Sequence, residues 1–162
     1  MSTRTNRQVL LNAHPVGFPV DTDFKMVETP APEPGDGELL IRTIYQSLDP
    51  YMRGRMNPGL SYTAGVSLGE VMGAGTVGQV VASRHDRFAE GDFVLSSNGW
   101  QEYAVSDGRG VRKLDPAAAP ISTARARSRN AWVLLTKAAP ELEAWAEYFS
   151  GYSATRAAVL AG

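Results

Sequence analysis

The chain has 162 residues, of which 43% are hydrophobic and 20% are charged, an ordinary composition for one soluble globular domain or one domain with a fragment. Its formal net charge of -1 supplies no overall positive field, which argues against binding nucleic acid or an anionic membrane surface. The absence of cysteine excludes a disulfide framework and a thiolate metal site. No apolar run approaches the ~20 residues that cross a bilayer, and the polar start lacks a signal region. We therefore expect a cytoplasmic protein.

The first part of the chain alternates short strand patterns with turns. Strands are predicted over 8–12 and 24–29, with a turn-rich stretch at 17–22 between them. Prolines and glycines over 30–37 interrupt regular structure, and the strongest strand pattern of the chain follows over 38–45.

The segment that follows this strand predicts a substrate pocket. Asp49 is suited to cap a helix N-terminus, and Pro50 is suited to the first helical position. Tyr51 would then sit on a fixed backbone, from which its phenol can hydrogen-bond a substrate carbonyl. Met52 and Met56 are expected to line an adaptable apolar pocket, with core packing as the alternative for each. Residues 57–69 are loop-like and are expected to form a flap beside the pocket.

A glycine pattern further along imitates a cofactor site. Gly73-Ala-Gly75-Thr-Val-Gly78 matches G-x-G-x-x-G, and Asp92 follows at the distance of a ribose-binding acid. A dinucleotide site needs a buried strand before the glycines and a helix after them. The sequence here predicts neither, so we interpret the glycines as part of a bent strand that allows a close backbone approach or a bulge.

The remaining strand patterns favour a barrel. Many short strands separated by turn signals are typical of such folds. The further candidate strands cover 76–82, 92–96, 100–105 and 110–114.

The character of the chain changes near Pro116, where it becomes rich in alanine. Residues 140–149 predict a helix with Pro140 at its start and acidic residues in its first turns, and 153–161 are a second candidate helix. The first helix has an apolar face that includes Trp145, which either folds back on the barrel or pairs two chains as a homodimer. Three arginines between 125 and 129 are interpreted as solvated, with phosphate or nucleic-acid contact as the alternative.

Several motifs together resemble the zinc-independent medium-chain dehydrogenase/reductases, in particular the NADPH-dependent enone reductases such as curcumin, prostaglandin and leukotriene B4 reductases. The resemblance runs from about Arg7 to about Ala124. The motifs that carry it are Arg7-Gln-Val-Leu-Leu11, Gly17-Phe-Pro19, Ser47-Leu-Asp-Pro-Tyr-Met-Arg53, Gly69-Glu-Val-Met-Gly-Ala-Gly-Thr-Val-Gly-Gln-Val-Val81, Gly91-Asp92 and Gly99-Trp-Gln-Glu-Tyr103.

The resemblance implies a mainly β fold, a GroES-like, partly open β-barrel that binds substrate. It implies NADP(H) as cofactor, no metal, and a small hydrophobic carbonyl compound as substrate, reduced at the C=C bond of an α,β-unsaturated ketone or aldehyde, or a quinone. Tyr51 matches the family's pocket tyrosine. Trp100 matches a family strand position beside the pocket, with core packing as its alternative. His14 and His85 lack clustered ligands and are interpreted as surface residues.

The chain departs from the family after Ala124. The family continues into a Rossmann domain, but residues 125–162 hold no strand, glycine loop and helix in series. We therefore predict a GroES-like domain over 1–124 and an atypical helical tail over 125–162, produced by truncation, a shifted reading frame or a fusion. Two functional hypotheses follow. The chain is the substrate domain of an NADP(H)-dependent reductase, or it is a non-catalytic domain that binds a hydrophobic carbonyl ligand or a protein partner.

Overall fold

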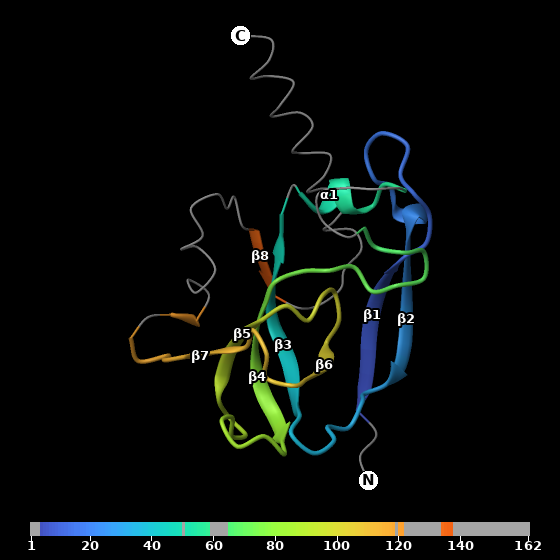
Figure 1. Ribbon diagram of the computed structural model, residues 1–162. Helices are drawn as coiled ribbons and strands as arrows, with labels where there is room; N and C mark the ends of the chain where they lie inside the picture. Colours follow the sequence, from blue (N-terminus) through green and yellow to red (C-terminus); the bar gives the residue numbers. More distant parts are fainter. Residues whose placement is uncertain (1–3, 50, 59–64, 119, 122–133, 138–162) are drawn as a thin grey trace.

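The computed structural model describes residues 4–49, 51–58, 65–118, 120–121 and 134–137, and within them the fold is mainly β (Figure 1). Helical structure in these residues is limited to short turns. No helix among them is both long enough and apolar enough to span a membrane. In chain order the elements are β1 (Thr5–Leu11), the 3-10 turn η1 (Asp21–Asp23), β2 (Phe24–Pro30), β3 (Leu39–Leu48), α1 (Met52–Arg55), β4 (Thr76–Ser83), β5 (Phe93–Ser96), β6 (Tyr103–Ser106), β7 (Arg112–Leu114) and β8 (Leu134–Lys137).

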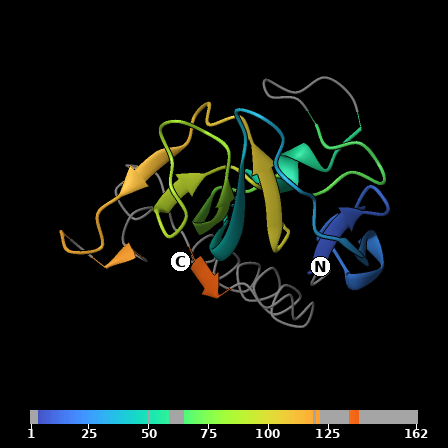
Figure 2. The ribbon, with the colours of Figure 1, turned by 90° about the horizontal axis from the view of Figure 1, so that it is seen from below.

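The strands form two antiparallel sheets that make a partly open, GroES-like barrel. The larger sheet has the order β6-β3-β4-β5-β7, and β8 pairs with β3 beside this path. The smaller sheet consists of β1 and β2 and stands beside the larger one (Figure 2). Strand β3 is the centre of the fold, because β4 pairs with one edge while β6 and β8 share the other. β6 pairs with residues 39–42 and β8 with residues 45–48.

The predicted strands agree with the observed ones to within a few residues at each end. β8 is an addition, because it lies in the tail for which only helices were predicted. The two helices expected over 140–149 and 153–161 lie outside the described residues, as does the domain boundary at Ala124.

The glycine pattern at 73–78 leads into a strand and not into a helix. β4 begins at Thr76, and Gly78 sits inside it opposite Thr43 of β3. A Cβ atom on Gly78 would lie 2.6 Å from the Arg42 carbonyl oxygen and 2.6 Å from a methyl group of Ile41. The prediction of a close backbone approach in an irregular strand is therefore confirmed, and the β3–β4 register also shifts on either side of this point.

Backbone hydrogen bonds join β1 to the segment that leads into β6. The amide of Val9 donates to the Trp100 carbonyl at 2.9 Å, and the Glu102 amide donates to the Arg7 carbonyl at 3.1 Å. The Arg7 side chain and backbone amide both donate to the Glu102 carboxylate. Partial burial on its own raises the pKa of Glu102, but the hydrogen bonds and charge of Arg7 outweigh burial and hold this pKa below its ordinary value.

The ion pair between Arg7 and Glu102 predicts that the stability of the fold falls in acid. The pKa of Asp92 is also lowered, first by a hydrogen bond from Lys113 and then by one from the Ala89 amide. Because the folded chain binds these protons less tightly than the unfolded chain, the free energy of unfolding falls as the pH drops below the unfolded pKa values, about 4. The two carboxylates contribute their full stabilisation at neutral pH. This contribution is lost as the pH falls through the lower pKa values that they have in the folded chain.

The check is urea unfolding of wild type and Glu102→Gln between pH 7 and pH 3. At pH 7 we expect the variant to be less stable by about 0.5–1 kcal/mol, since Arg7 is partly exposed. The difference should shrink as the pH falls below about 4. A difference that stays constant down to pH 3 would contradict the assignment.

Among the described residues, the buried apolar side chains form two clusters. The first cluster is formed by side chains of β3, β4 and β5 in the larger sheet together with Phe88. The second lies between β1, the end of β3 and α1. The first contains Leu39, Ile41, Val80, Phe88 and Val94. The second contains Val9, Leu11, Phe24, Leu48, Met52, Met56, Val66, Met72, Ala74 and Trp100. Through Met52 and Met56, the second cluster anchors the predicted pocket segment to the core.

Candidate functional site

The predicted pocket segment forms a single tight turn at the end of β3. Helix α1 begins at Met52 with Tyr51 as its first flanking residue, and the Met52 amide donates to the Asp49 carbonyl at 3.0 Å. Tyr51 is 43% exposed. Helix α1, which follows it, lies at the same end of the molecule as the loop between β1 and η1 (Figure 1). A phenol on such a turn is available to a carbonyl ligand.

The expected side-chain cap by Asp49 is wrong. The residue that flanks the helix is Tyr51, and it makes no side-chain capping bond. The Asp49 carboxylate instead accepts a hydrogen bond of 2.8 Å from the buried Ser47 hydroxyl. The helix is one turn long, so Asp49 lies too far before it to cap it, and its carboxylate fixes the strand end. Pro50 lies outside the described residues.

Three further predicted site residues lie together in the core next to this turn. Met52 and Met56 are fully buried, and Trp100 is 2% exposed and packs against Phe24 with ring centroids 5.5 Å apart. All belong to the second apolar cluster. Met52, Met56 and Trp100 are therefore buried in the core, whereas Tyr51 is accessible. Residues 59–64, the middle of the expected flap over 57–69, lie outside the described residues.

Helix α1 is tied to the loop between β1 and η1, which the sequence analysis did not predict. Arg53 donates through Nε to the Gly17 carbonyl and through a terminal nitrogen to the Pro15 carbonyl, each at 2.8 Å. His14 Nδ1 lies 2.7 Å from the Met56 carbonyl oxygen and must be the donor, since that oxygen only accepts. The two carbonyls that Arg53 binds are 36 and 38 residues away in the chain, so no local pattern identifies them.

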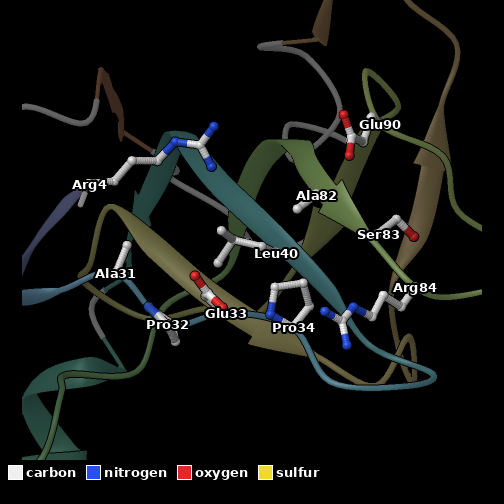
Figure 3. A pocket seen from close by; sticks show the side chains of 10 residues that line it. All are labelled: Arg4, Ala31, Pro32, Glu33, Pro34, Leu40, Ala82, Ser83, Arg84 and Glu90. Atoms are coloured by element: carbon white, nitrogen blue, oxygen red, sulfur yellow. The ribbon is translucent and has the colours of Figure 1, made fainter. Parts of the chain in front are cut away.

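A groove of about 400 Å³ lies at the opposite end of β3 from α1. Its floor contains Leu40 and Ala82, and Figure 3 shows Arg4, Glu33, Arg84 and Glu90 around its rim. The positive and negative side chains alternate around the opening. None of the predicted site residues lines this groove, so it is separate from the Tyr51 turn.

The described residues do not fit a dinucleotide. The pyrophosphate of such a cofactor needs glycines followed by a helix N-terminus. Here the glycine pattern enters β4, and the space beside Gly78 is filled by β3. In the same residues no group of three His, Asp or Glu side chains is placed as a set of metal ligands. His85 Nδ1 accepts a hydrogen bond from the Arg87 amide, 3.0 Å away in its own turn.

Comparison with known proteins identifies the barrel. A family described as the N-terminal domain of oxidoreductase matches residues 7–114. The NADPH-dependent curcumin reductase of Escherichia coli is 47% identical over 109 residues, which are 67% of this chain and 32% of the relative. Rat prostaglandin reductase 1 is 34% identical over 117 residues, 70% of this chain and 33% of the relative. The chain thus spans about a third of the length of these relatives.

A solved structure gives the same result for the fold. CurA from Vibrio vulnificus in complex with NADPH is 45% identical, with a TM-score of 0.69 over 73% of this chain and 35% of that one. A second family, described as SAV_6107-like HEPN, matches residues 111–162, where the oxidoreductase match has almost ended. By residues 7–114 the chain belongs to the medium-chain dehydrogenase/reductases, in their enone reductase branch.

Proposed function

We propose that the barrel is the substrate-binding domain of a zinc-independent, NADP(H)-dependent cytoplasmic reductase. Its substrates are hydrophobic α,β-unsaturated ketones, aldehydes or quinones. The observation that carries the proposal is the exposed Tyr51 phenol on a turn anchored by the buried side chains of Met52 and Met56. The 47% identity to a curcumin reductase supports the choice of substrate class.

The role of Tyr51 follows from where charge develops. Reduction of a C=C bond conjugated to a carbonyl moves negative charge onto the carbonyl oxygen. A neutral phenol donates a hydrogen bond to that oxygen, and a donor fixed before the reaction stabilises the charge without reorganising. Burial of the two methionines fixes the backbone that carries the phenol. Met52, Met56 and Trp100 therefore support the site from the core.

The second part of the proposal concerns residues 125–162. We propose that this tail is part of a unit of a different family, because the second family match covers 111–162. The described residues do not fit the cofactor, so its site belongs to residues outside them or to another polypeptide.

The test is a titration of the purified chain with curcumin, whose fluorescence rises in apolar surroundings. We expect saturable binding, and Tyr51→Phe should weaken it about 3- to 10-fold, the loss of one hydrogen bond. Tyr103→Phe, which removes a phenolic hydroxyl from β6, is the matched control and should bind like wild type. Binding that is absent, or unchanged in Tyr51→Phe, would contradict the proposal.

A second measurement separates the two functional hypotheses. The chain is mixed with NADPH and curcumin, and oxidation of the nicotinamide is followed by absorbance. Turnover means that the chain itself is an active reductase. Curcumin binding without turnover supports a ligand-binding domain without catalysis of its own.

A further inference from the structure

The loop between β1 and η1 presents apolar side chains to solvent at the end of the molecule that carries Tyr51. Val16 is fully exposed, Phe18 is 53% exposed and Val20 is 56% exposed. Together these three residues are called the apolar rim. Single exposed apolar residues are common on protein surfaces. Three exposed apolar residues within five positions of one loop are typical of a surface that binds a partner or ligand.

This loop is held in place by side chains from α1 and from its own start. Arg53 bonds the carbonyls of Pro15 and Gly17, on either side of Val16. His14 bonds the Met56 carbonyl at the other end of the helix. Gly17 adopts a φ of +82°, so the loop follows a path that an ordinary residue rarely takes. These bonds fix the loop relative to α1.

The candidate donor, Tyr51, directly precedes the same helix. Arg53 is the second residue of α1, so only one residue of the chain separates it from Tyr51. Arg53 reaches the loop directly, and its guanidinium therefore ties the turn that carries Tyr51 to the loop that carries the apolar rim. Its third contact, 2.6 Å from a terminal nitrogen to Asn57 Oδ1, fixes the rotamer of the arginine.

We infer that the apolar rim determines specificity and that Arg53 is its positioning residue. Phe18 contacts the apolar or aromatic part of a carbonyl substrate whose oxygen is bound by Tyr51. The inference rests on the proposed function and deepens it, since it selects bulky aryl enones over short aliphatic ones. Removal of an apolar contact from a hydrophobic site changes discrimination by roughly 10-fold or more.

The experiment measures the affinity of the full chain for two probes, trans-4-phenyl-3-buten-2-one and 3-penten-2-one. Both carry the enone, but only the first has a ring for the rim. Phe18→Ser should weaken binding of the phenyl probe about 10-fold and change the aliphatic probe less than about 2-fold. Arg53→Met should show the same selective loss, and Arg53→Lys should restore part of it.

The matched control is Arg109→Met, which removes a 91% exposed arginine in the turn after β6 and should alter neither affinity. Equal loss for both probes, or no loss in Phe18→Ser while wild type binds both, overturns the inference alone. Failure of wild type to bind either probe overturns the proposed function and the inference with it. A shift from dimer to monomer in Phe18→Ser, measured by sedimentation, would assign the rim to a second copy of the chain and also overturn the inference.

Discussion

Gly78→Ala is expected to be strongly destabilising, although it adds a single methyl group. That methyl would lie 2.6 Å from the Arg42 carbonyl oxygen and 2.6 Å from Ile41, a distance that real contacts do not show. The carbonyl belongs to β3, the strand that pairs with β4, β6 and β8, so it has little freedom to retreat. Overpacking of this kind typically costs 1–3 kcal/mol, and we expect about 3 kcal/mol here because the obstacle is backbone.

Urea unfolding followed by tryptophan fluorescence measures this loss. The control is Gly54→Ala in α1, where an added Cβ meets nothing within 4 Å. That substitution should be neutral or slightly stabilising, because alanine favours helix over glycine by up to about 1 kcal/mol. Equal stabilities for the two variants would mean that β3 and β4 are not packed as described.

Trp100→Ala is the second large effect. The indole is fully enclosed in the second apolar cluster and packs on Phe24, next to the two methionines under the Tyr51 turn. Truncation of a buried tryptophan costs about 3–5 kcal/mol, a large part of the 5–15 kcal/mol that stabilises a typical domain. The variant should therefore unfold at markedly lower temperature or fail to accumulate as soluble protein.

The control for Trp100→Ala is Phe18→Ala, which truncates an aromatic side chain that is half exposed. It should change the free energy of unfolding by less than about 0.5 kcal/mol. Differential scanning calorimetry of both variants tests the pair. A small effect at Trp100 would contradict its assignment to the core and return it to the list of residues available to a ligand.

The strands of this fold could be predicted because their signals are local. Alternation of apolar residues and turn residues marks 39–48 and 76–83 directly, and the absence of a helix after the glycines at 73–78 can be argued from the spacing of the chain. β8 could not be predicted, because its pairing with β3 depends on a partner about 90 residues away and residues 134–137 carry no distinctive pattern of their own.

The candidate site was only partly predictable for a related reason. Tyr51 is found from the motif around it, but whether Met52 and Met56 face a ligand or the core depends on Phe24 and Trp100, which come from other parts of the chain. Asp49 has the right chemistry for a cap, and the short helix begins too late for its carboxylate to act as one. The Arg53 bonds to Pro15 and Gly17 involve backbone carbonyls, which every residue has, so no sequence pattern reveals them.

Strand β8, which belongs to the tail, lies against the part of β3 that leads into the Tyr51 turn. β8 pairs with residues 45–48, the last four residues of the strand, and the turn follows three residues later. If ligand binding orders that turn, it also favours the strand pairing beside it, and by thermodynamic reciprocity the pairing favours the ligand by the same factor. A partner that binds the tail and withdraws β8 would therefore lower ligand affinity without touching the site, which makes the tail a potential effector of the barrel.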